Sequence, residues 1–192
     1  MKALNICIDI DGTITDPYFW LDSANKYFNK NITSEEITQY EVHKVLKVSR
    51  EDYTKFYNKN KFTLHNREDI NKDAVDIIQE LIKSNNIYFV TAREKSLEIL
   101  TREYLNRNKV PYDGIYVLGT YHKVDTAKNL NCDLFIEDSF ENAVELSKNG
   151  FKVLLVDTNY NRFPLKENIK RVFNWSQIYN IVTRVLLQEK AV

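Results

Sequence analysis

The chain of 192 residues carries 27 basic and 27 acidic residues, and 43% of its residues are hydrophobic. A chain of this size can bury one sizeable core plus a small appendage, so we expect one domain with an insertion rather than two full domains. The balanced charge gives no overall field that would attract a polyanion, so a nucleic acid polymer is not expected as a partner.

Cysteine content and the apolar runs indicate the compartment. The chain has only two cysteines, Cys7 and Cys132, which are too few for a disulfide framework and favour a reducing cytoplasm. The first apolar stretch ends at Asp9, so it is too short for a signal peptide or a membrane span, and no later run approaches membrane length. We therefore expect a cytoplasmic protein without a membrane partner.

Short apolar runs predict the strands of one parallel sheet. They are rich in Val, Ile, Leu and aromatic residues, as in strands that are buried on both faces. In chain order the runs are residues 4–8, 87–90, 115–118, 134–136 and 153–156. Apolar residues recur with helical spacing over 74–82 and 97–105, and Ser139 and Gly150 are candidate ends of a further helix. This alternation is typical of a Rossmann-like, doubly wound α/β domain.

The alternation stops after the first strand, where charged and aromatic residues follow one another without a strand pattern. Three helices are predicted there, over residues 16–30, 33–47 and 49–62. Thr33 and Ser49 are candidate N-caps, because Glu36 and Asp52 follow them three residues later.

These helices predict a division of the chain into two parts. Residues 1–13 and 72–192 would form the α/β core, and residues 14–71 a helical cap inserted after the first strand. An insertion at that point would lie over the C-terminal ends of the strands, where open α/β sheets bind their ligands.

The strongest chemical signal is the pair Asp9 and Asp11 at the end of the first strand. On an extended segment the two side chains point the same way, and Gly12 lets the backbone turn away afterwards. Adjacent carboxylates repel each other unless a cation or a shared proton lies between them. The alternative for such a pair on its own is a helix cap with an incidental neighbour.

Three further signals follow later strands: Thr91, Lys123, and Glu137 with Asp138. Taken singly, each has a structural explanation as a helix cap or a solvated side chain. Together with the aspartate pair they fall just beyond the C-terminal strand ends of one predicted sheet. The structural explanations do not predict this coincidence, so the four signals indicate a single site.

At these positions the sequence resembles the haloacid dehalogenase superfamily of phosphatases, whose motifs are Asp-x-Asp, Ser/Thr, Lys and a terminal acidic pair. The segments DIDGTITD, YFVTAR and DLFIEDSFENA, with the helical insertion, are similar to the 5'(3')-deoxyribonucleotidase family and its bacterial relatives. The resemblance extends over nearly the whole chain. It departs from the family at Glu137, where Asp is frequent, and at Pro17, where an aromatic residue usually follows the Asp matched by Asp16.

Phosphoryl transfer needs an in-line nucleophile, neutralised phosphoryl oxygens and a protonated leaving oxygen. Asp9 would attack phosphorus to form an aspartyl phosphate, and Asp11 would act as general acid and then base. Thr91 and Lys123 would bind the phosphoryl group.

The hard oxygen donors, without a His or Cys cluster, favour Mg²⁺ as the cation. The resemblance implies that the Asp9 carboxylate, the Asp11 backbone carbonyl and Asp138 are the ligands, with Glu137 in a supporting position.

Substrate recognition is expected to come from the cap. Tyr18, Phe19 and Trp20 are the candidates for nucleobase contact, and the alternative is that the cap aromatics, Tyr53, Phe56 and Tyr57 included, form the cap core. Arg93 either reaches the substrate or cap, or is simply solvated. Residues 157–162 are expected to wall the pocket, or to form only a turn.

We thus predict a Mg²⁺-dependent phosphomonoester hydrolase, specifically a 5'(3')-(deoxy)nucleotidase that acts on a nucleoside monophosphate. A phosphatase for another small ester such as a phosphosugar would keep every catalytic residue and differ in the cap. A phospho-accepting signalling domain and a non-catalytic binding module are the alternatives from other functional classes.

Overall fold

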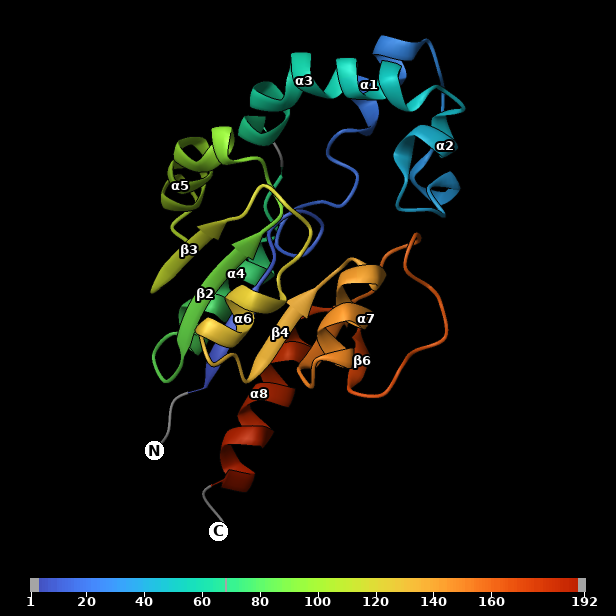
Figure 1. The fold of residues 1–192 in the computed structure, drawn as a ribbon. Coiled ribbons are helices and arrows are strands. Elements are labelled where there is room, and N and C mark those ends of the chain that lie inside the picture. The colour runs from blue at the N-terminus through green and yellow to red at the C-terminus, as the bar shows by residue number, and fades with distance from the viewer. Residues whose placement is uncertain (1–3, 68, 190–192) are drawn as a thin grey trace.

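The computed structural model describes residues 4–67 and 69–189, and it contains a six-stranded parallel sheet in the order β3-β2-β1-β4-β5-β6 (Figure 1). The strands are β1 (Asn5–Ile8), β2 (Asn86–Thr91), β3 (Gly114–Val117), β4 (Leu134–Glu137), β5 (Lys152–Val156) and β6 (Ile169–Val172). The first five are the predicted strands. This strand order confirms the doubly wound α/β fold.

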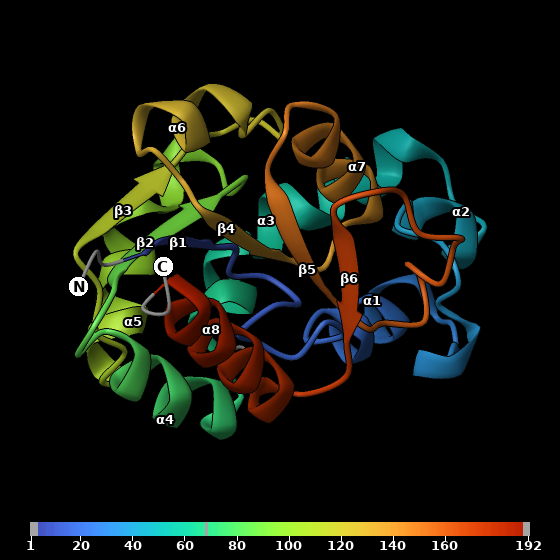
Figure 2. The same ribbon diagram turned by 90° about the horizontal axis from the view of Figure 1, so that it is seen from below.

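Helices cover both faces of the sheet (Figure 2). One face is covered by α4 (Lys72–Leu81), α5 (Glu98–Arg107) and α8 (Trp175–Glu189), and the other by α6 (Val124–Asn129) and α7 (Phe140–Lys148). A 3₁₀ turn, η2 (Lys95–Leu97), precedes α5. Each face has its own buried apolar cluster, which explains why the central strands read as continuous apolar runs.

The ends of α7 form as the sequence predicts. The Ser139 side chain accepts a hydrogen bond from the backbone nitrogen of Asn142 at 3.4 Å. Gly150 follows the helix with φ +87°, in the left-handed region that favours glycine.

The cap lies beyond the C-terminal ends of the strands (Figure 1). It consists of α1 (Leu21–Phe28), the 3₁₀ turn η1 (Ser34–Glu36), α2 (Val42–Leu46) and α3 (Arg50–Arg67). The N-caps at Thr33 and Ser49 are confirmed: the Thr33 nitrogen donates to Glu36 at 2.8 Å, and the Ser49 hydroxyl accepts from the Asp52 nitrogen at 3.0 Å. The cap buries an apolar cluster of its own that includes Trp20, Ile37 and Phe56.

The prediction of one continuous helix over 33–47 is wrong. That segment forms η1 and the short α2, joined by residues 37–41. Ile37 leaves the helical region with φ −79° and ψ 79°, and its side chain is buried in the cap cluster. Burial of this side chain therefore competes with continuation of the helix.

The two connections between core and cap lie side by side. Thr15 and Ile70 form an antiparallel bridge, and the Asn71 nitrogen donates to the carbonyl of Ile14 at 2.9 Å. This pairing is consistent with a domain boundary near residues 14 and 71, which stays a prediction. In the described part of the chain, no helix combines the length and apolar character needed to cross a membrane.

Candidate active site

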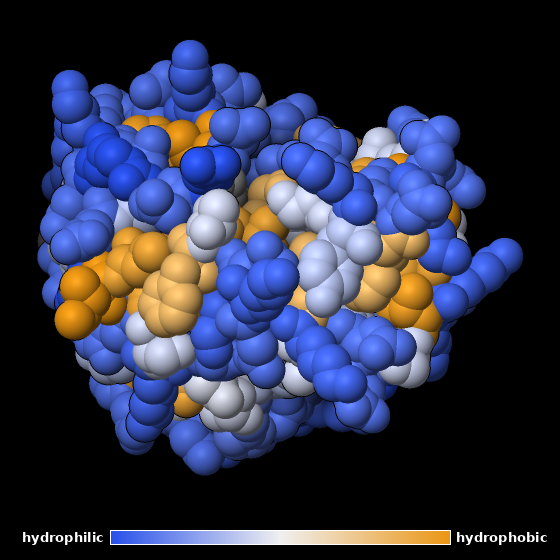
Figure 3. All heavy atoms as spheres, turned by 90° about the horizontal axis from the view of Figure 1, so that it is seen from above, coloured by the Kyte–Doolittle hydropathy of each residue, from blue (hydrophilic) through white to orange (hydrophobic). Residues whose placement is uncertain are grey.

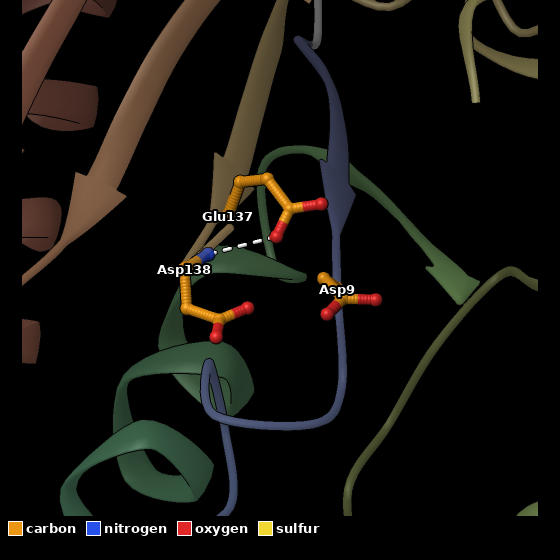
Figure 4. Close-up of side chains that lie close together, drawn as sticks. All are labelled: Asp9, Glu137 and Asp138. Atoms are coloured by element: carbon orange, nitrogen blue, oxygen red, sulfur yellow. Dashed lines mark hydrogen bonds between the residues drawn. The ribbon is translucent and has the colours of Figure 1, made fainter. Parts of the chain in front are cut away.

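Three buried carboxylates meet where two neighbouring strands end. Asp9 follows β1, and its backbone nitrogen extends the strand pairing by donating to the carbonyl of Ile136 at 3.0 Å. Glu137 ends β4 and Asp138 follows it, so that one carboxylate oxygen from each of the three residues lies within 4.8 Å of the others. Figure 4 shows these side chains converging from the two strand ends.

Gly12 makes this close approach possible. Its φ is +77°, and a Cβ at this position would lie 2.5 Å from Oδ2 of Asp138. Both the backbone conformation and the lack of space therefore require glycine directly after the aspartate pair.

Lys123 connects the acids from the start of α6. Its side chain is only 1% exposed, and Nζ donates to Oδ1 of Asp9 at 2.6 Å and to Oε1 of Glu137 at 2.8 Å. The two like-charged acids are thus held together by one buried ammonium group.

Glu137 has hydrogen-bond donors on both oxygens. Oε1 also accepts from Nδ2 of Asn142 at 2.8 Å, and Oε2 accepts from the backbone nitrogens of Asp138 and Ser139 at 2.8 and 3.1 Å. Although burial opposes ionisation, Lys123 and these donors lower the pKa of Glu137. Its geometry therefore suits a supporting carboxylate rather than a metal ligand.

Burial and neighbouring carboxylates raise the pKa values of Asp9 and Asp138. Burial, together with the charges of Glu137 and Asp11, raises the pKa of Asp9 to about 7 despite the opposing effect of Lys123. Burial and the carboxylates of Glu137 and Asp9 raise the pKa of Asp138 well above its usual value. A divalent cation would offset this charge, and a donor set of carboxylate oxygens suits Mg²⁺ or Ca²⁺. The residues present therefore fit a hard cation.

Asp11 lies in a different environment from Asp9. Arg93 donates to its carboxylate from Nε at 3.0 Å and from Nη2 at 2.6 Å, and Nδ1 of His65 lies 3.4 Å from Oδ1. Burial alone would raise the pKa of Asp11, but Arg93 and His65 hold it well below its usual range. In this state Asp11 is an ionised carboxylate.

Arg93 is buried, so the interpretation as a solvated residue is wrong. It contacts the carboxylate of Asp11 and donates from Nη1 to the hydroxyl of Thr101 at 3.3 Å. His65 reaches Asp11 from the last turns of the cap helix α3, and no sequence pattern indicated this contact.

Thr91 ends β2 with only 1% of its surface exposed, and it lines the same cavity as Asp9. Its hydroxyl accepts a hydrogen bond from the backbone nitrogen of Arg93 at 3.3 Å. The hydroxyl proton therefore stays available for a phosphoryl oxygen.

The loop between β5 and β6 contributes two side chains that contact Asp138. The Tyr160 hydroxyl donates to Oδ2 of Asp138, and Nδ2 of Asn161 donates to the Asp138 carbonyl at 2.7 Å. Among residues 157–162, Tyr160 lines the cavity. Only the position of this segment, directly after a strand, could have signalled its role.

A cavity of about 630 Å³ lies between the core and the cap. The core residues Asp9, Asp11, Thr91, Arg93, Lys123 and Asp138 line it, as do the cap residues Phe19, Trp20, Tyr40, Arg50, Tyr53 and Tyr57. Apolar side chains emerge among hydrophilic ones on the face of the molecule that is seen from above (Figure 3). The predicted core site residues thus line one cavity, except Glu137, which is fully buried behind Lys123 and Asp138.

The three aromatic residues predicted to contact a base lie in different places. Phe19 is half-buried and lines the cavity, with its ring centroid 5.3 Å from that of His65. Trp20 reaches the cavity wall but is buried in the cap cluster, and its Nε1 donates to the carbonyl of Pro17. Tyr18 lines a second cavity instead, and its hydroxyl accepts from the nitrogen of Asn159.

Comparisons with known proteins indicate the family of the chain. A model of the family described as "5' nucleotidase, deoxy (Pyrimidine), cytosolic type C protein" matches residues 2–189. A nucleotidase of Clostridium acetobutylicum is 55% identical over 192 residues, which are the whole of both chains.

Two solved structures show the same fold. A haloacid dehalogenase-like hydrolase from Streptococcus pneumoniae has a TM-score of 0.72 and 15% identity, over 93% of this chain and 98% of that one. The hydrolase YfnB from Bacillus subtilis, solved bound to magnesium, has a TM-score of 0.61 and 14% identity, over 95% and 99% of the two chains. The chain has the fold of these haloacid dehalogenase-like hydrolases. Because the family model covers nearly the whole sequence, the chain belongs to the cytosolic type C 5'-nucleotidase family and is a phosphoric monoester hydrolase.

Proposed function

We propose that the protein hydrolyses nucleoside or deoxynucleoside 5'- or 3'-monophosphates through an aspartyl-phosphate intermediate, with Mg²⁺ as cofactor. The observation that carries this proposal is the position of Asp9, which lines the substrate-sized cavity while Lys123 and Asp138 flank it. The family described above supports a nucleotide substrate, and its description as cytosolic supports a cytoplasmic location.

Asp9 is the proposed nucleophile. Lys123 holds Oδ1, which leaves Oδ2 as the attacking atom. Attack forms a bond between Oδ2 and phosphorus while the ester bond to the leaving oxygen breaks, and water later hydrolyses the aspartyl phosphate. Lys123 offsets the charge of the nucleophile and of the phosphoryl group together.

Asp11 is the proposed proton donor to the leaving oxygen and the later acceptor from water. Its contact with Arg93 means that the proton must be acquired after the substrate arrives. A phosphate dianion beside the pair would raise the pKa of Asp11 and compete for the guanidinium of Arg93, and both effects favour protonation.

Mg²⁺ bound by the carboxylates of Asp9 and Asp138 and by the backbone carbonyl of Asp11 would supply charge neutralisation to the phosphoryl oxygens. Thr91 would donate its hydroxyl proton to one of these oxygens. A single such donor is worth roughly 3 kcal/mol in the transition state.

The cap, residues 14–71, is proposed to select the leaving group, because the strand-end residues contact only phosphate and metal. Phe19, Tyr53 and Tyr57 present aromatic rings to the cavity. Stacking of a base on such a ring is worth about 1–3 kcal/mol.

The proposal is tested by phosphate release from nucleoside monophosphates, deoxynucleotides and sugar phosphates, with and without Mg²⁺. Asp9→Asn should abolish release without unfolding the protein, whereas the matched control Asp73→Asn, at an exposed position in the first turn of α4, should retain it. Substantial activity in Asp9→Asn would exclude the covalent mechanism. A preference for sugar phosphates would exclude the nucleotide assignment and leave the mechanism intact.

A further inference from the structure

Tyr160 reaches the acidic cluster from the loop between β5 and β6. Its side chain is buried, and its ring packs edge-on against Tyr18 and Tyr40, with centroid distances of 6.2 and 5.7 Å. Its hydroxyl donates to Oδ2 of Asp138. Tyr18 and Tyr40 of the cap thus hold the ring in place, and the hydroxyl donates a hydrogen bond to one oxygen of a proposed metal ligand.

The loop that carries Tyr160 is itself held in place. Oδ1 of Asn161 accepts from the backbone nitrogen of Thr158 at 3.2 Å and from Nη1 of Arg171 at 2.6 Å. The amide of Asn161 donates to the carbonyl of Asp138 at 2.7 Å. Both the backbone and the carboxylate of Asp138 are therefore anchored by consecutive residues of one loop.

The contact between Tyr160 and Asp138 is built with little spare space. A Cβ on Gly12 would lie 2.5 Å from Oδ2 of Asp138 and 2.7 Å from the Tyr160 hydroxyl. A carboxylate oxygen accepts hydrogen bonds, so the phenolic hydroxyl of Tyr160 is the donor in this contact.

The two oxygens of Asp138 consequently differ. Oδ2 is engaged by Tyr160, whereas Oδ1 has only a long contact of 3.5 Å from the hydroxyl of Thr13. Figure 4 shows the Asp138 carboxylate directed toward Asp9. One oxygen of Asp138 is therefore available to a cation, and the second is engaged by Tyr160.

We propose that Tyr160 makes the site selective for Mg²⁺ over Ca²⁺ by keeping Asp138 a one-oxygen ligand; this inference rests on the proposed metal site. Mg²⁺ requires near-octahedral geometry at short distances, which single carboxylate oxygens satisfy. Ca²⁺ takes more oxygens and commonly binds a carboxylate through both of them. A hydrogen bond that occupies the second oxygen of Asp138 opposes Ca²⁺ more than Mg²⁺.

The test compares wild type with Tyr160→Phe, which keeps the packed ring and removes the hydroxyl. Tyr18→Phe is the matched control, because its hydroxyl belongs to a ring that touches Tyr160 and instead accepts from Asn159. Full-length protein freed of metal with EDTA is titrated with MgCl₂ and separately with CaCl₂. The rise in thermal unfolding midpoint gives an apparent Kd for each metal without reference to activity.

Loss of a hydrogen bond to a charged oxygen changes an equilibrium constant by about tenfold or more. Tyr160→Phe should therefore shift the ratio of Ca²⁺ affinity to Mg²⁺ affinity toward Ca²⁺ by about tenfold. Tyr18→Phe should leave the ratio unchanged. An unchanged ratio in Tyr160→Phe, with Mg²⁺ binding that Asp138→Ala abolishes, would overturn the role of Tyr160 and leave the metal site standing.

Two further outcomes are decisive. If wild type and Asp138→Ala respond to Mg²⁺ equally, the proposed metal site fails and the inference fails with it. If Tyr160→Phe does not fold, as judged by circular dichroism, the wild-type titration still decides, because the inference requires wild type to bind Mg²⁺ more tightly than Ca²⁺. The reverse order overturns it.

Discussion

Replacement of Lys123 by Met should destabilise the metal-free protein strongly at neutral pH. The ammonium group is buried and lies 2.6 Å from Asp9 and 2.8 Å from Glu137. Removing one partner of a buried ion pair costs about 3–5 kcal/mol, because the other charge remains buried without compensation. Since a natural domain is stable by only about 5–15 kcal/mol, this is a large part of the free energy of unfolding.

The loss should depend on pH in a defined direction. Folding raises the pKa of Asp9 from 3.8 to about 7, so the folded protein binds this proton more tightly than the unfolded chain does. This tighter binding adds to the free energy of unfolding at low pH, and the contribution is lost as the pH rises through the pKa of the folded protein. Without Lys123 the pKa of Asp9 would rise further. The deficit of Lys123→Met relative to wild type should therefore be larger near pH ~8 than near pH ~5, where Asp9 is protonated in the folded protein.

Chemical denaturation in EDTA at both pH values measures the free energy of unfolding. Lys128→Met, on the helix that Lys123 precedes, is the matched control, since that side chain is exposed and should change the free energy of unfolding by no more than about 0.5 kcal/mol. A Lys123→Met protein as stable as the control at both pH values would refute the view that Lys123 compensates the buried acids.

Other predictions concern the neighbours of this ion pair and the cap. Asp138→Ala should weaken the Mg²⁺-dependent rise in unfolding temperature more than Glu137→Ala does, because the oxygens of Glu137 are engaged within the protein; equal effects would contradict this assignment. Gly12→Ala should reduce both stability and Mg²⁺ affinity through its clash with Asp138, and unchanged thermal unfolding with and without Mg²⁺ would contradict it. Phe19→Leu should lower kcat/KM for nucleotides but not for sugar phosphates, by roughly tenfold for each 1.4 kcal/mol of stacking lost. Equal slowing of both substrate classes by Phe19→Leu would exclude base recognition at this residue. Trp20→Leu should instead mainly lower the unfolding temperature, because Trp20 is buried in the cap cluster.

The sequence predicts the central sheet well because both faces of its strands are covered. Strands such as Leu134–Glu137 are buried at every position and read as apolar runs. The edge strand β6 was missed because Lys170 and Arg171 interrupt its apolar residues. Lys170 is exposed, and Arg171 is accommodated by an ion pair with Asp157 at 2.9 Å. The helix α8 was also not predicted, although Trp175, Ile178 and Val182 have helical spacing and are buried.

The sequence predicts those residues of the candidate site whose positions follow from the order of the parallel strands. Parallel strands deliver Asp9, Thr91 and Asp138 to one edge, so their positions after the strands were sufficient to bring them together. His65 and Tyr160 could not be found in this way. One comes from a cap helix and the other from a loop, and their contacts with the acids depend on how cap and core pack, which strand periodicity does not encode.

The proposed reaction requires Asp9 to be ionised and Asp11 to be protonated, but the surroundings of these two aspartates favour the reverse. A nucleophile must be ionised, yet the pKa of Asp9 is raised to about 7, and a general acid must carry a proton, yet the pKa of Asp11 is held well below its usual range. Positive charge beside Asp9 would lower its pKa, and negative charge beside Asp11 would raise its own. A cation and a phosphate dianion bound together supply these two charges, and either one alone corrects only one of the aspartates. The contacts of Asp9 and Asp11 therefore favour a site in which the first chemical step waits until both metal and substrate are in place.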